Sequence, residues 1–292
     1  MAKSTRGRRA VAQQLGLIDQ PTPTATSGKR GARPTRQKLP TDRAIFWTMI
    51  KRIFKWVFRL VAAFFIVSIL LVVIYRFIDP PITPLMLIRP LEGATSGNVV
   101  GVTKAWVSID DVSPALLRSL IAAEDGKFFT HGGVDMKALE RAKAYNERMK
   151  GKKLRGASTI TMQCARNVFL WQGRNYIRKG LEIYFTYLME FVWGKKRILE
   201  VYINVIEWGD GVYGVEAASQ KYFGISARDL NARQAALLAS VLPNPRRWSP
   251  AAPTGYINKR ASAIQGRARG VSLAPITTTN KTTPAEPKRK KK

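Results

Sequence analysis

Residues 123–133 read AEDGKFFTHGG and directly follow an apolar run with helical spacing, residues 116–123. Ser113 and Pro114 are typical of the start of this helix, as a capping side chain and a proline at the first helical position. Glu124 therefore ends an apolar helix, and an apolar surrounding suits a carboxylate to abstract a proton. The alternative is a solvated carboxylate at a helix end, which the accompanying Phe128 and His131 disfavour.

A second polar segment, GASTITMQ, occupies residues 156–163. Ser158, Thr159 and Gln163 lie at the expected start of a helix, where free backbone N–H groups favour phosphate. A plain Ser/Thr helix cap is the alternative. The segment is therefore a candidate anion-binding element.

A third segment, RKGLE, occupies residues 178–182. Arg178 and Glu182 have the i,i+4 spacing of a surface ion pair, worth about 0.3 kcal/mol. The functional interpretation is a second glutamate beside the fixed cations Arg178 and Lys179. That combination suits a phosphate-bearing substrate.

The chain carries 49 Lys and Arg residues against 19 Asp and Glu, a net charge of +30. Such a charge attracts polyanions of any kind. The basic ends lack interleaved aromatic residues for stacking bases, so we expect no nucleic-acid partner and attraction to membrane phospholipid instead. The single cysteine, Cys164, forms no intramolecular disulfide and is expected in the core, and one histidine excludes a multi-histidine zinc centre.

Residues 60–75 are uncharged and apolar, with basic residues on both sides. Flanking apolar residues extend the run to the length of a bilayer span, so we predict one transmembrane helix. A buried core helix or a cleaved signal peptide are the alternatives; nothing would cover the first, and no cleavage site follows the run. The basic residues before the span place the N-terminus in the cytoplasm and the following domain on the periplasmic side of the inner membrane.

The sequence predicts five regions. They are a disordered basic cytoplasmic arm (1–43), the transmembrane anchor region (44–78), a linker (79–94), a mainly α-helical domain (95–268) and a disordered basic tail (269–292). Within the domain, helical periods cover residues 136–149, 159–170, 176–193, 195–205, 213–222, 230–242 and 256–265, with a short strand near 99–107.

Four motifs together resemble those of the peptidoglycan glycosyltransferase family, glycosyltransferase family 51. They are E-D-x-x-F-x-x-H-x-G from Glu124, G-x-S-T-I-T-x-Q from Gly156, R-K-x-x-E from Arg178, and K-x-x-I-L-E-x-Y-x-N from Lys195. The resemblance covers about residues 95–265 and lacks a transpeptidase domain, as in the monofunctional members. It implies a lysozyme-like fold with a smaller membrane-proximal lobe.

The resemblance implies a hexosyltransferase that joins a glycan on polyprenyl pyrophosphate to the N-acetylglucosamine 4-hydroxyl of lipid II, with inversion. Glu124 would be the base, and Glu182 would orient the donor phosphates directly or through a divalent ion such as Mg or Mn, with no organic cofactor. The implied substrate-binding residues are Asp125, Phe128, His131, Ser158, Thr159, Gln163, Arg166, Arg174, Arg178 and Lys179. Of these, His131 is expected to act as a hydrogen-bonding turn residue; Lys195, Tyr202 and Asn204 would brace the cleft.

Met162 and Gln234 depart from the family pattern, which bears on fine positioning and on neither glutamate. Two other functions compete with the transferase: a membrane-anchored lysozyme-like hydrolase, and a non-catalytic scaffold. Cations around Glu182 favour a phosphate-bearing substrate over a neutral glycan, and two retained glutamates disfavour the scaffold. Cell-wall synthases or division proteins are the protein partners that the resemblance implies.

Overall fold

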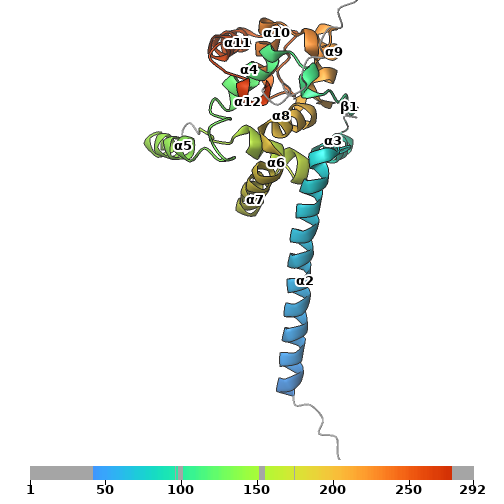
Figure 1. Ribbon diagram of the computed structural model, residues 1–292. Helices are drawn as coiled ribbons and strands as arrows, with labels where there is room; N and C mark the ends of the chain where they lie inside the picture. Colours follow the sequence, from blue (N-terminus) through green and yellow to red (C-terminus); the bar gives the residue numbers. More distant parts are fainter. Residues whose placement is uncertain (1–41, 96, 98–100, 151–154, 174, 278–292) are drawn as a thin grey trace, which may run out of the picture. The chain divides into compact units, whose positions relative to one another are not determined.

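The structure is a computed structural model that describes residues 42–95, 97, 101–150, 155–173 and 175–277 (Figure 1). The chain divides into two compact units, Met1–Arg59 and Leu60–Lys292. The described part of the first unit is the beginning of helix α2 (Asp42–Phe77), which continues into the second. Residues 1–41 of the predicted arm and 278–292 of the predicted tail lie outside the described residues.

Helix α2 is long and apolar enough to cross a membrane over Phe46–Phe77, the one such helix in the described part of the chain. Most of its large apolar side chains are exposed, among them Phe54 and Leu70. A water-soluble domain rarely leaves so many apolar side chains uncovered. This pattern fits a helix that lies in lipid.

The second unit is mainly helical, which confirms the predicted fold class. Its α-helices are α3 (Pro84–Thr95), α4 (Pro114–Glu124), α5 (Met136–Arg148), α6 (Ile160–Phe169), α7 (Tyr176–Val192), α8 (Gly194–Val205), α9 (Val215–Phe223), α10 (Ala232–Val241), α11 (Gly255–Ala268) and α12 (Ala274–Thr277). Two short 3₁₀ turns, η1 (Ile109–Asp111) and η2 (Ala227–Asp229), precede α4 and α10.

Two helical groups build the core of this unit (Figure 1). Helix α10 packs on α11 and α4, while α6 packs on α7 and α8. The largest fully buried side chains include Trp208, Tyr202, Phe128, Leu116 and Leu120. Leu116 and Leu120 are one helical turn apart on α4, so the same apolar face that the sequence shows holds α4 in the core.

Three short strands add a small sheet of order β1-β3-β2. Strand β1 (Thr103–Lys104) lies within the predicted strand region and pairs in parallel with β3 (Val212–Tyr213). Strand β2 (Glu207–Gly209) pairs antiparallel with β3, through a hairpin that the sequence analysis did not predict. Tyr213, expected as the first helical residue, is in β3, and α9 begins two residues later.

Two predicted boundaries differ from the structure. The expected linker 79–94 contains most of α3, because Thr83 accepts a hydrogen bond from the Met86 N–H, Pro84 occupies the first helical position, and Leu85 and Met86 are buried. The expected tail begins too early, because Leu273 and Ile276 are buried against the core. Only from residue 278 onward does the predicted tail lie outside the described residues.

Candidate active site

Glu124 is presented by the C-terminal end of α4. Ser113 caps the start of this helix by accepting a 3.3 Å hydrogen bond from the Ala115 N–H. The helix ends where Asp125 leaves the helical conformation, with φ −157°. The Glu124 side chain is 14% exposed, so it is partly accessible at the end of α4.

Two side chains hold the Glu124 carboxylate. Gln163 Nε2 donates a 2.9 Å hydrogen bond to Oε2, and Arg260 Nη2 lies 3.8 Å from Oε1. The Tyr202 hydroxyl donates to Gln163 Oε1 at 3.1 Å, which turns the amide nitrogen toward Glu124. Burial raises the pKa of Tyr202 well above its ordinary value, so the phenol stays a neutral donor.

Asp125 and His131 form a largely enclosed pair in the motif that begins at Glu124. His131 Nδ1 accepts the Gly133 N–H at 3.1 Å, so the ring proton on Nε2 is donated to Asp125, whose two oxygens are each 3.0 Å away. Asp125 also accepts the Ile160 N–H at 3.1 Å. The contacts of His131 match its expected role as a hydrogen-bonding turn residue, and with Asp125 it joins the first motif to the start of α6. Binding of substrate by either residue stays a prediction.

A second set of contacts locks the same two motifs together. Thr159 caps α6 through the Met162 N–H and donates to the Gly133 carbonyl. Lys195 donates to the His131 carbonyl at 2.8 Å and to Glu190 at 2.7 Å. These bonds fix the backbone of the motif that begins at Glu124, so Thr159 and Lys195 support the cleft.

Phe128 is fully buried, which differs from its predicted contact with substrate. The Lys195 ammonium lies 4.6 Å from the centre of its ring. A cation over an aromatic face is attracted by the ring's quadrupole. Phe128 therefore anchors the first motif in the core.

Glu182 is the most enclosed carboxylate of the site, 1% exposed. Its two oxygens pair with different cations, Arg178 through Nη1 and Lys179 through Nζ at 2.6 Å. Lys179 also donates to Ser158 Oγ at 3.4 Å, which links α7 to the GASTITMQ segment. The i,i+4 pair of Arg178 and Glu182 is thus buried, whereas Lys179, the second cation on Glu182, is partly exposed.

The surroundings of Glu182 do not fit a resident metal ion. Both of its oxygens are occupied by cations, whose charge opposes a second cation in the same place. No group of three or more His, Cys, Asp or Glu side chains gathers at metal-binding distance within the residues that the structure describes. Both Glu182 oxygens are therefore engaged by Arg178 and Lys179 and not by Mg or Mn.

The cleft consists of two adjoining hollows that share Arg155, Gly156 and Ser158. One, of about 710 Å³, is lined by Glu124, Gln163 and Arg260. The other, of about 1110 Å³, has a largely apolar lining with Lys179 among its polar residues. Glu124 and the partly exposed ammonium of Lys179 thus line one continuous depression.

The remaining predicted residues lie around this depression. Arg166 lines a smaller hollow of about 180 Å³ with Gln163 and Tyr202, and its buried Nε has no hydrogen-bond partner among the described residues. Asn204 bonds both the N–H and the carbonyl of Val107, ahead of α4. Arg174 lies outside the described residues.

Two residues of the site were missed in the sequence. Arg260 comes from α11, far along the chain, and no local pattern marks it. Glu190 accepts hydrogen bonds from Thr161 at 2.6 Å and from Lys195. Its signal was available, because one carboxylate within the apolar stretch 184–193 implies a buried partner.

The known proteins to which this chain is similar share one name and agree with one family model. The family model described as Transglycosylase matches residues 93–269. Curated proteins named "Biosynthetic peptidoglycan transglycosylase" match from Caulobacter vibrioides (54% identity, 68% of this chain and 83% of the relative) and Bdellovibrio bacteriovorus (51%, 73% and 84%). The protein of that name from Rhodospirillum centenum is 48% identical over 75% of this chain and 92% of its own length.

Proposed function

The chain belongs to the transglycosylase family, and from this we propose that it is a peptidoglycan glycosyltransferase that polymerises lipid II. The donor is a growing glycan on polyprenyl pyrophosphate, and the acceptor is the N-acetylglucosamine 4-hydroxyl of lipid II. The products are a glycan longer by one disaccharide and polyprenyl diphosphate.

The observation that carries this proposal is the setting of Glu124. Its carboxylate faces the cleft while Gln163 and Arg260 fix its orientation and stabilise its negative charge. As base, Glu124 accepts the proton of the acceptor hydroxyl while that oxygen forms a bond to the donor's anomeric carbon. The bond from this carbon to the pyrophosphate oxygen breaks on the opposite side, so the configuration inverts.

The contacts of Glu182 favour transfer over hydrolysis. A glycosidase of the usual kind needs a second carboxyl group as acid or nucleophile. Glu182 is buried and paired with two cations, so it has no free oxygen for either task. A pyrophosphate leaving group needs charge neutralisation instead, and Lys179 at the edge of the cleft supplies it.

The membrane arrangement follows from the same substrate. Helix α2 anchors the protein in the bilayer that holds the lipid-linked donor. The basic residues that precede the apolar run favour a cytoplasmic N-terminus and a catalytic domain on the periplasmic face of the inner membrane. Basic residues near the span also attract anionic phospholipid head groups.

The test is polymerisation of fluorescent lipid II by the detergent-solubilised full chain, with products resolved on a gel before and after lysozyme treatment. We expect lysozyme-sensitive polymer from the wild type and none from Glu124→Gln. Release of fragments from preformed glycan would favour the hydrolase, and normal polymer from Glu124→Gln would overturn the role of the base. Parallel reactions with EDTA or with added Mg and Mn test whether polymerisation requires a divalent ion. Equal rates are expected.

A further inference from the structure

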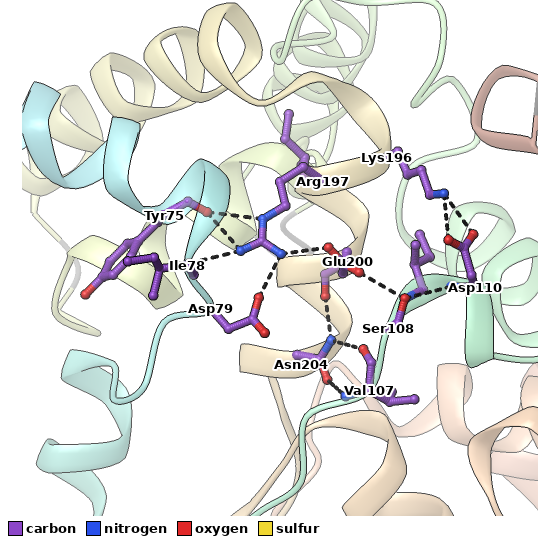
Figure 2. Close-up of polar contacts among 12 residues, drawn as sticks. Tyr75, Ile78, Asp79, Val107, Ser108, Asp110, Lys196, Arg197, Glu200 and Asn204 are labelled. Atoms are coloured by element: carbon purple, nitrogen blue, oxygen red, sulfur yellow. Dashed lines mark hydrogen bonds and ion pairs between the residues drawn. The ribbon is translucent and has the colours of Figure 1, made fainter. Parts of the chain in front are cut away.

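One arginine of the catalytic domain forms hydrogen bonds to the C-terminal end of the membrane helix (Figure 2). Arg197, on α8, donates from Nε and Nη2 to the Tyr75 carbonyl at 3.1 and 3.0 Å, and from Nη2 to the Ile78 carbonyl at 3.0 Å. Its Nη1 donates to Asp79 at 2.9 Å and to Glu200 at 2.7 Å. All five N–H groups of the guanidinium thus have a partner.

Helix chemistry explains why a cation belongs at this place. The last carbonyls of a helix have no partner within it, and they form the negative end of the helix dipole. Arg197 satisfies two carbonyls at or just beyond the end of α2, and its side chain is only 14% exposed. Its guanidinium also lies 5.6 Å from the centre of the Trp106 ring. The arginine thus contacts both the end of α2 and the Trp106 ring.

The same contacts lead toward the catalytic glutamate. Glu200 accepts from Arg197 with one oxygen and from the Ile109 N–H with the other, at 3.1 Å. One turn later, Asn204 bonds both the N–H and the carbonyl of Val107 (Figure 2). The segment held in this way runs directly into the cap of α4, the helix that ends at Glu124. A continuous set of polar contacts thus joins the end of the membrane helix to the catalytic helix.

Other contacts attach the preceding turns of α2 without reaching this segment. Ser68 shares a 2.8 Å hydrogen bond with Tyr184, and Trp193 Nε1 donates to the Val72 carbonyl at 2.6 Å. Both partners belong to α7 or to the residue after it. Loss of Arg197 alone should therefore leave α2 beside α7 and loosen only its link to α8 and the segment before α4.

We propose that Arg197 is a positioning residue that sets the catalytic cleft at a fixed height and tilt above the bilayer, so that a lipid-linked substrate reaches Glu124 without leaving the membrane. This inference rests on the proposed polymerisation of lipid II. A substrate dissolved in detergent approaches the cleft freely. The contacts of Arg197 with the end of α2 should therefore affect the reaction rate only when enzyme and substrate share a bilayer.

The experiment compares full-length wild type, Arg197→Gln and Arg246→Gln in two assays. Arg246 is the matched control, because its ion pair with Asp210 is on the exposed surface and involves neither α2 nor the segment before α4. One assay uses long-chain lipid II in vesicles of phosphatidylethanolamine and phosphatidylglycerol, and the other a short-chain lipid II analogue in detergent. Removing several hydrogen bonds to a charged group should lower the vesicle rate of Arg197→Gln about tenfold. Its rate in detergent should stay within about twofold of the wild type, because the substrate there approaches the cleft freely and the lost hydrogen bonds are remote from Glu124.

Hydrogen exchange of full-length protein in vesicles gives an independent measure. The backbone amide of Ile78, which donates to the Ile74 carbonyl at 2.9 Å, should exchange faster in Arg197→Gln, while the amides of α4 keep their protection. Equal loss of rate in both assays, or loss of protection across α4, would show a merely structural role and overturn the proposal. A vesicle rate of Arg197→Gln equal to that of the wild type would overturn it too. Absence of polymer from wild type in both assays would instead contradict the proposed function.

Discussion

Gln163 donates a 2.9 Å hydrogen bond to Glu124, and this bond joins the second motif to the first. The amide cannot turn over without losing both this bond and the one from Tyr202. Gln163 was predicted to bind substrate, but its contacts are those of a group that orients the base. The fourth motif thus acts on the first through the second, which gives one physical reason for their occurrence together.

Tyr202→Phe should lower kcat about fivefold, because the Gln163 amide loses the donor that fixes its orientation and one buried hydrogen bond contributes about 1 kcal/mol. The KM for lipid II should hardly change, since the buried Tyr202 hydroxyl does not touch the cleft surface. Steady-state rates over a range of lipid II concentrations measure both constants. A raised KM with unchanged kcat would assign Tyr202 to substrate binding.

Gly133→Ala should destabilise the fold by about 2 kcal/mol or more, for two reasons. Gly133 has φ +95°, and an added Cβ would lie 2.6 Å from Thr186 Cγ2 and 2.9 Å from Glu190 Cγ. Gly132→Ala is the matched control, because nothing lies within 4 Å of its Cβ position. Thermal unfolding of both variants provides the comparison; equal melting temperatures would contradict this account of the motif glycine.

The helices that carry the motifs were predictable because their signals are local. Ser113-Pro114 marks the start of α4, and Thr159 marks the start of α6, as the structure shows. The same type of signal, Thr83-Pro84, marks the start of α3, which lies mostly within the linker predicted over residues 79–94. The gap between the expected helices 176–193 and 195–205 falls at Gly194, which separates α7 from α8 with φ +72°.

The rest of the site depends on distant parts of the chain. Nothing near Arg260 indicates that α11 brings it to Glu124. The predicted contact of Phe128 with substrate failed for a related reason, since a motif shows which residues occur together and not which of them are buried. Glu207 and Tyr213 pair only because a hairpin folds the chain back, and this pairing outweighed the helical pattern of residues 213–222.

Cys164 should not react with a maleimide in the native protein. It is fully buried, and burial raises the pKa of its thiol, so the reactive thiolate is disfavoured. Mass spectrometry after a timed exposure should find the native chain unmodified and the guanidinium-unfolded chain modified once. Rapid labelling of the native chain would mean that α6 opens locally.

Glu182→Gln should abolish polymerisation and lower stability by about 3 kcal/mol, because removing one partner leaves the buried Arg178 charge uncompensated. Exposed Glu140→Gln, on α5, is the control and should leave both properties unchanged. Polymerisation on a gel and denaturant unfolding measure the two effects. Adding Arg178→Met to Glu182→Gln removes the unpaired charge, so this double variant should recover stability but not activity. Recovery of both would mean that the buried pair only supports α7, whereas recovery of stability alone would assign these side chains to the neutralisation of pyrophosphate.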